Sequence, residues 1–144
     1  MAAQLDLWSA PEPLPIVIPE SDEIVTPSAG LRVYQEKAVT NSIREIGTER
    51  STLVVMPTGS GKTRVMTEIA RRRAGDKILV LAHRDELLQQ ARERFAHDCG
   101  ERVGLDKADD FAADERIVVG SIQTVSMPAR LQRFGPSRFD LIMV

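Results

Sequence analysis

The stretch STLVVMPTGSGKT, residues 51–63, places a glycine-rich loop between an apolar run and a segment with helical periodicity. The β-branched run 51–56 predicts a strand that is buried on both faces, and residues 61–75 predict a helix. Glycines let such a loop curl until its backbone N–H groups point at phosphate oxygens, and the helix N-terminus adds positive potential. Because the loop follows a strand and opens a helix, it predicts a phosphate-binding site rather than a chance glycine turn.

Lys62 and Thr63 carry the chemistry expected of this loop. The Lys62 ammonium can reach the β- and γ-phosphates of a nucleotide, and the Thr63 hydroxyl can be a ligand of Mg²⁺. We therefore expect ATP and Mg²⁺ as cofactors, with Lys62 and Thr63 as catalytic residues and Thr63 as the metal ligand. The residues expected to contact the nucleotide here are Pro57, Thr58, Gly59, Ser60, Gly61, Lys62, Thr63 and Arg64.

The rest of the chain alternates between strand and helix patterns. Three further apolar runs, at 77–83, 116–125 and 139–144, predict strands. Apolar residues at helical spacing predict helices over 31–47 and 85–100, and the acidic stretch 106–115 reads as a loop. Strands that alternate with helices of this length indicate an α/β fold with a doubly wound parallel sheet.

The first 29 residues differ from the remainder in composition. Five of the eight prolines lie within the first 28 residues, and proline at that density disfavours helix and central strand. Residues 1–31 contain five acidic residues and no Lys or Arg, whereas the rest of the chain holds 19 basic and 16 acidic residues. We therefore divide the chain into an extended, disordered tail, 1–29, and one domain, 30–144.

Other classes of protein are excluded by simple counts. The single cysteine rules out an internal disulfide framework and a cysteine-based metal cluster. No apolar run approaches the roughly 20 residues that span a bilayer, and the N-terminus lacks the pattern of a signal peptide. The expected location is the cytoplasm, in a bacterium or a phage-infected cell.

Five segments in order resemble superfamily 2 helicases of the DEAD/DEAH type. The loop has Met56 where the strict phosphate-loop pattern has glycine, and this variant is similar to the helicase form. LRVYQ (31–35) resembles the segment whose glutamine recognises adenine, which implies that role for Gln35. LAHRDELLQQA (81–91), VGSIQTV (119–125) and FDLIMV (139–144) resemble, respectively, two motifs that contact nucleic acid and the strand leading into motif II.

The resemblance is strongest to the group of type III restriction subunits and UvrB-like repair helicases. It implies an incomplete RecA-like P-loop NTPase domain, the N-terminal ATP-binding part of an ATP-dependent DNA helicase or translocase. RNA as the nucleic acid is not excluded. The residues it implies for nucleic-acid contact are Arg84, Gln90, Ser121, Gln123 and Thr124. For Arg84 the alternative is a surface ion pair with Asp85 or Glu86, and for Ser121 and Thr124 it is ordinary turn chemistry.

The chain ends just before the Asp-Glu pair of motif II in that family. There the Asp holds Mg²⁺ and the Glu orients the attacking water, while a second domain supplies an arginine finger. Asp140 cannot replace them, because it precedes the strand. We therefore expect a polypeptide of these 144 residues to bind nucleotide weakly and hydrolyse it negligibly.

Two other functions remain open from the sequence. The chain could be a non-catalytic module that binds a nucleotide or a sliding clamp, or the motor of a restriction or remodelling complex that translocates without unwinding. QLDLW (4–8) resembles the peptide by which bacterial proteins dock on the replication clamp, through Gln4, Leu5, Leu7 and Trp8. The alternative is an ordinary amphipathic segment of the disordered tail.

Overall fold

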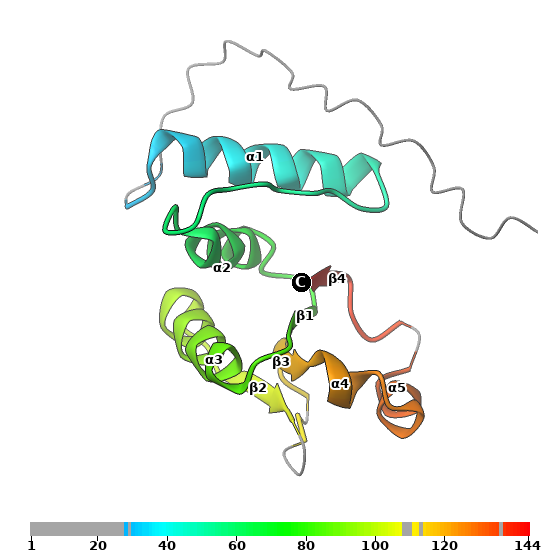
Figure 1. Cartoon of the computed structure of the whole chain (residues 1–144). Coiled ribbons are helices and arrows are strands. Elements are labelled where there is room, and N and C mark those ends of the chain that lie inside the picture. Colours follow the sequence, from blue (N-terminus) through cyan, green and yellow to red (C-terminus); the bar gives the residue numbers. More distant parts are fainter. Residues whose placement is uncertain (1–27, 29, 108–110, 113, 136) are drawn as a thin grey trace, which may run out of the picture.

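The computed structural model describes residue 28 and residues 30–107, 111–112, 114–135 and 137–144. Four parallel strands form one sheet in the order β2-β3-β1-β4 (Figure 1). Their bounds are Ile78–Ala82 for β1, Val103–Asp106 for β2, Ile117–Ser121 for β3 and Leu141–Met143 for β4. The tail 1–27 and its predicted clamp peptide lie outside the described residues, so both remain predictions.

Helices cover both faces of this sheet. The long helices α1 and α3 and the helix α2 after the glycine loop match the three helices expected from periodicity (Figure 1). None of the helices in the described ranges has the length and apolar content that a membrane span requires. The helix bounds are Val33–Thr48 for α1, Lys62–Arg72 for α2, Asp85–Cys99 for α3, Ile122–Val125 for α4 and Pro128–Phe134 for α5.

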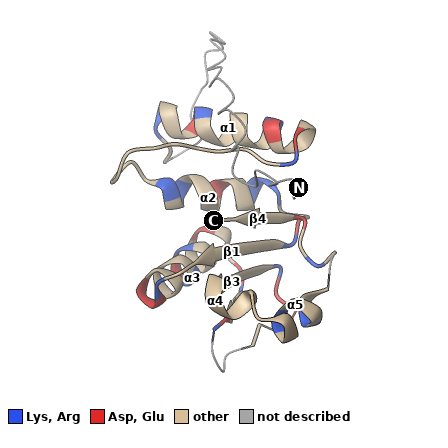
Figure 2. Ribbon diagram, turned by 45° about the vertical axis from the view of Figure 1, so that its right-hand side comes forward, with Lys and Arg blue, Asp and Glu red and all other residues tan. Residues whose placement is uncertain are grey.

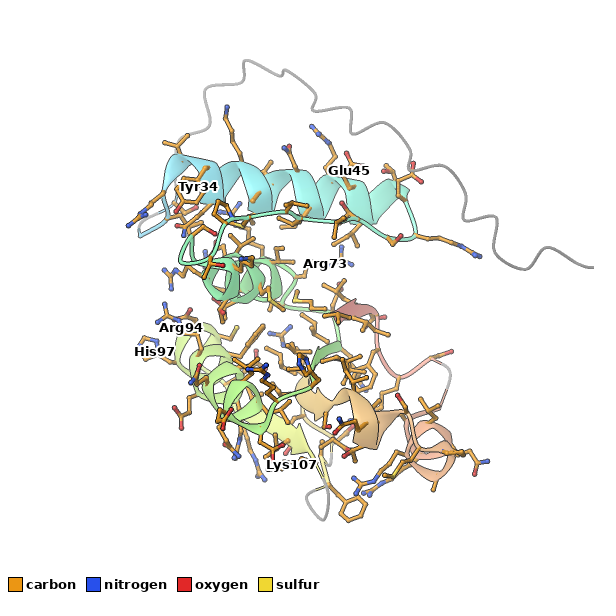
Figure 3. The ribbon with its side chains drawn as sticks, in the orientation of Figure 1. Tyr34, Glu45, Arg73, Arg94, His97 and Lys107 are labelled. Carbon is orange, nitrogen blue, oxygen red and sulfur yellow. The ribbon has the colours of Figure 1, made fainter. Side chains whose placement is uncertain are left out.

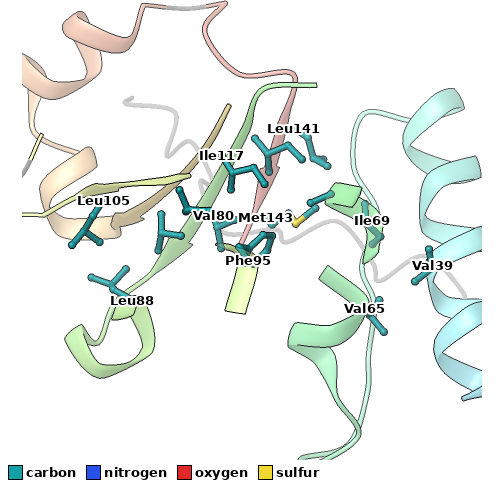
Figure 4. Packing of buried hydrophobic residues seen from close by; sticks show 14 of the residues in the cluster. Val39, Val65, Ile69, Val80, Leu88, Phe95, Leu105, Ile117, Leu141 and Met143 are labelled. Atoms are coloured by element: carbon teal, nitrogen blue, oxygen red, sulfur yellow. The ribbon is translucent and has the colours of Figure 1, made fainter. Parts of the chain in front are cut away.

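The strands alternate their side chains between two apolar cores. Ile78 and Val80 of β1 point into a large core beneath α2 and α3, together with Phe95 and Leu88 (Figure 4). Leu79, between them, points into a smaller core on the side of α4 and α5. Because successive side chains of a strand face opposite sides, both faces of the sheet are buried. The α/β, doubly wound parallel fold predicted from the sequence is confirmed.

The predicted strand 51–56 is not part of the sheet. This segment runs beside α1 in an extended path without ladder partners among the described residues (Figure 1). Leu53 is 85% exposed and Val55 80% exposed. A β-branched run gains strand structure only when a neighbouring strand pairs with it, and β4, the edge strand on this side, lies across a cavity of about 220 Å³ from the segment.

The fourth strand of the sheet, β2, lies at the edge opposite β4 and was not predicted from periodicity. β2 has only four residues, VGLD, and its glycine and aspartate disfavour a strand assignment. The structure buries Asp106 because Arg130 of α5 pairs with it at 2.9 Å. The acidic stretch 106–115 therefore begins inside the sheet rather than as a loop, and residues 108–110 and 113 lie outside the described ranges.

Two predicted bounds need correction. The run 116–125, predicted as a strand, is a strand only to Ser121, because α4 follows β3 directly. The helix predicted to end at residue 47 continues to Thr48. On α3, Leu88 is fully buried, whereas its neighbour Leu87 is exposed.

Candidate nucleotide-binding site

The glycine loop has the backbone geometry that a phosphate site requires. Gly59 and Gly61 have φ values of +78° and +85°, in the left-handed region that residues with a Cβ atom rarely adopt. Ser60 N–H donates to Pro57 O at 3.3 Å, which closes the turn, and Val65 N–H donates to Gly61 O at 3.2 Å, which opens α2. The first N–H groups of α2 have no acceptor within the helix, so they remain directed toward the loop.

Gln35 joins α1 to this loop. Its Nε2 donates to Ser60 O at 2.8 Å, and its Oε1 accepts from the Arg32 N–H at 2.9 Å. The side chain is 6% exposed, and a Cβ atom on Gly61 would lie 2.5 Å from its Nε2. Tyr34 also donates, through its hydroxyl, to Ser60 O at 2.9 Å. The predicted adenine-recognition residue therefore lies directly against the phosphate loop.

Lys62 and Thr63 occupy the first turn of α2. Lys62 Nζ donates to Pro57 O at 3.0 Å, so the ammonium is folded over the loop in this structure. Within the described part of the chain the Thr63 hydroxyl makes no hydrogen bond, and the residue is exposed. A cationic head beside a ring of backbone N–H groups, with a free hydroxyl next to it, fits a nucleotide triphosphate and its Mg²⁺.

Arg64 points away from the loop toward α3. Its Nη1 lies 3.1 Å from Asp98 Oδ2, and Asp98 also accepts hydrogen bonds from Thr67 and Arg94, both at 2.8 Å. Burial opposes the ionisation of Asp98, but hydrogen bonds from His97, Thr67, Arg64 and Arg94 outweigh it and lower its pKa to about 2. Asp98 is therefore ionised at neutral pH and binds α2 to α3.

The end of β4 reaches the same region. Val144 and Lys62 both line the cavity between β4 and segment 51–56. Asp140 lies at the other end of the strand, where its Oδ2 accepts the Lys77 N–H at 2.8 Å. The structure thus agrees with the expectation that Asp140 is remote from the phosphates.

Two of the residues predicted for nucleic-acid contact, Arg84 and Ser121, lie at the carboxyl ends of β1 and β3, and the other three lie on the helices α3 and α4 that follow these strands. Ala82 pairs with Ser121, which places Arg84 and the start of α4 at neighbouring strand ends. Arg84 is exposed and forms no ion pair with a described residue. Asp85, one of the two acids considered as its partner, pairs instead with Lys107 at 2.8 Å. Gln90 and Gln123 are exposed as well. Ser121 and Thr124 are buried, so their side chains cannot reach a ligand without a local movement.

Basic residues continue beyond this edge. Figure 2 shows Lys and Arg residues on α5, and a mixture of basic and acidic residues on α1 and α2. The arginines of α5 contact an aromatic ring, because the guanidinium carbon atoms of Arg130 and Arg133 lie 3.8 and 4.6 Å from the Phe111 ring centroid. No single face in this view is uniformly basic.

Sequence reasoning missed four residues near the loop. Tyr34 and Arg32 stand beside Gln35 in the quoted segment LRVYQ, so their position could have suggested them. Arg94 and Asp98 lie on α3, 33 and 37 residues after Gly61, the last residue of the loop, and no local pattern marks them. Figure 3 shows Arg94 at the end of α3 beside α2, and Tyr34 at the start of α1.

The comparisons with known proteins agree with this geometry. A search of curated proteins found no match. Residues 28–144 match the model of a family described as "Type III restriction enzyme, res subunit", a family of superfamily 2 helicase N-terminal domains. The match covers all the described helices and strands, from just before α1 to the end of β4. The chain therefore belongs to the type III restriction enzyme res subunit family.

Proposed function

We propose that this chain is the ATP-binding portion of an ATP-dependent DNA helicase or translocase. The observation that carries the proposal is the loop 57–61, whose two left-handed glycines lead into α2 with Lys62 and Thr63 in its first turn. The family supports a helicase-type ATP-binding module. In the complete enzyme, ATP hydrolysis would drive movement along nucleic acid.

Each residue of the site has a distinct role in this proposal. The loop N–H groups and the N-terminus of α2 hold the phosphates, and Lys62 neutralises the β- and γ-phosphates once its ammonium leaves Pro57 O. Thr63 is the protein ligand of Mg²⁺, which when bound would neutralise charge on the phosphate oxygens. Gln35 reads the adenine from its position on α1, and its bond to Ser60 O links the base to the loop.

A titration with a fluorescent ATP analogue tests the nucleotide site. Replacement of Lys62 by Ala removes the cation that balances the phosphate charge, so we expect affinity to fall at least tenfold. Arg71→Ala is a suitable control, because Arg71 is a half-exposed arginine of the same helix that pairs with Glu68. Retained affinity in the Lys62 variant would show that the nucleotide binds elsewhere.

We also propose that Arg84 contacts a nucleic-acid phosphate at the end of β1. The support is its exposure and the lack of an ion pair with any described residue. Arg84→Ala should weaken binding of single-stranded DNA and reduce its salt dependence by about one phosphate contact. Arg102→Ala, at an exposed arginine paired with Glu115, serves as the control. Equal losses for both variants would count against a specific role for Arg84.

A second candidate function is a nucleotide-binding module that does not turn over ATP. It is favoured by the position of Asp140, whose Oδ2 accepts the Lys77 N–H at the end of β4 that is remote from Lys62. We expect a polypeptide of these 144 residues to release negligible phosphate in a malachite-green assay, with or without DNA. DNA-stimulated turnover would exclude this candidate.

A further inference from the structure

A cavity of about 450 Å³ opens on the Gln35 side of the phosphate loop. Its volume lies within the range of small-molecule sites. Three of its lining residues are arginines, and they come from three different helical regions of the chain. The lining consists of Gly30, Arg32, Gln35, Gly59, Ser60, Gly61, Arg64 and Arg94.

Asp98 fixes two of these arginines. Its Oδ2 accepts from Arg94 Nε at 2.8 Å and lies 3.1 Å from Arg64 Nη1. The Asp98 side chain is only 4% exposed, and Thr67 and His97 complete its hydrogen bonds. A buried carboxylate with this many donors holds both guanidinium groups in place before any ligand binds.

Arg94 has free capacity to bind. Its side chain is 47% exposed and bonds to Asp98 through Nε. Its Nη atoms have no hydrogen-bond partner among the described residues. A guanidinium group is planar, can stack on an aromatic ring, and donates hydrogen bonds in a fixed fork. Arg94 therefore presents both a flat surface and unpaired donors to the cavity.

The position of the cavity indicates which part of a nucleotide it would receive. The phosphates belong at the loop N–H groups and Lys62, whereas Gln35, the expected adenine contact, lines the cavity itself. We propose that Arg94, held in place by Asp98, contacts the nucleoside half of ATP and contributes to affinity for it. This inference rests on the proposed ATP site.

Titration with two different ligands distinguishes the proposed role of Arg94 from that of the phosphate site. Calorimetric titration with ATP and with inorganic tripolyphosphate should show that Arg94→Ala weakens ATP binding about tenfold, as expected for the loss of a charged hydrogen bond, and leaves tripolyphosphate affinity unchanged. Lys62→Ala should weaken both ligands. Arg94→Lys keeps the charge but loses the planar fork, so it should not restore ATP affinity.

Arg92→Ala is the matched control on the same helix. Arg92 donates through Nε to Val103 O at 3.3 Å and lines a different cavity, so its replacement should leave both affinities unchanged. Circular dichroism melting of each variant checks that it is folded. Unchanged ATP affinity in Arg94→Ala, or an equal loss for tripolyphosphate, would overturn the inference. If wild-type protein bound neither ligand, the proposed ATP site itself would fail and the inference with it.

Discussion

Gly61 is the residue on which the geometry of the loop depends most directly. Its φ of +85° is strained for any residue with a Cβ atom, and such an atom would meet Gln35 Nε2 at 2.5 Å. Gln35 cannot move aside cheaply, because it is buried and donates to Ser60 O. The absence of a Cβ atom at position 61 therefore permits both the left-handed turn and the contact between the loop and α1.

Replacement of Gly61 by Ala should lower the free energy of unfolding and weaken nucleotide binding. The left-handed conformation costs a residue with a Cβ atom about 1–2 kcal/mol, and the loss of the Gln35–Ser60 hydrogen bond adds about 1 kcal/mol. Urea unfolding and nucleotide titration would measure the two effects.

Gly59→Ala provides the comparison for Gly61. It has a similar φ, but no heavy atom lies within 4 Å of the added Cβ atom. We expect it to show the backbone strain alone. An equal loss of nucleotide affinity in the two variants would contradict a specific role for the Gln35 contact.

Asp98 makes the stability of the domain depend on pH in the acidic range. Its pKa is lowered from 3.8 to about 2 in the folded protein, so between these two pH values the folded state binds fewer protons than the unfolded state. The ionised Asp98 therefore stabilises the folded state by on the order of 2 kcal/mol above about pH 4, and this contribution is lost as the pH falls toward 2.

Asp98→Asn should remove this contribution. The difference in unfolding free energy between wild type and variant should be large at pH 6 and shrink between pH 4 and pH 2, as measured by chemical denaturation at each pH. Glu36 and Glu68 also have lowered pKa values, but they are present in both proteins and cancel from the difference. A difference that stays constant with pH would show that Asp98 does not titrate in this way.

At the scale of elements, α2 is the helix on which the site depends, and the carbonyl groups at its C-terminal end need hydrogen-bond donors from outside the helix. Arg116, just before β3, donates to the carbonyl oxygens of Ala70, Arg73 and Asp76 and pairs with Glu101. The last carbonyl groups of a helix have no donors within the helix. Arg116 supplies those donors and thereby joins the end of α2 to the sheet.

Arg116→Ala should therefore destabilise the domain by about 2–3 kcal/mol, because several buried acceptors and one carboxylate lose their partner. Thermal unfolding monitored by circular dichroism would measure the change. Arg102→Ala removes an exposed arginine paired with Glu115 and should cost less than about 1 kcal/mol. Similar losses in both variants would mean that Arg116 is only a surface residue.

At the scale of the whole molecule, one edge of the sheet, formed by β4, has no partner strand among the described residues. Leu53, Val54 and Met56 face β4 across the cavity, and the patch formed by Leu53, Ile142 and Val144 is exposed. Exposed apolar surface and an unpaired edge strand favour association with other chains. Self-association is the expected consequence at high protein concentration.

Leu53→Ser should reduce this self-association with little effect on stability, because the residue is already exposed. Sedimentation velocity over a range of protein concentrations would measure the oligomeric fraction. Met127→Ser, at an exposed apolar residue outside this patch, is the control. If both substitutions changed association equally, the patch would not be its cause.

Much of the fold follows from local patterns along the chain. The helical periodicity of α1, α2 and α3 and the apolar runs of β1, β3 and β4 are visible in sequence because each element buries one side or both. The loop 57–61 is equally visible, since only glycine adopts its backbone conformation readily and only a lysine and a hydroxyl suit its chemistry. The order of the motifs resembles helicases strongly enough to predict the family.

Tertiary structure alone decided the rest, because contacts across the chain determined it. The short, polar-ended β2 is a strand only because β3 pairs with it and Arg130 neutralises Asp106, and the strand-like segment 51–56 stays outside the sheet because no strand pairs with it. Likewise, nothing local marks Arg94 or Asp98. The packing of α3 against α2 brings them to the loop, since the energy of a hydrogen bond or an ion pair depends on distance in space and not on separation in sequence.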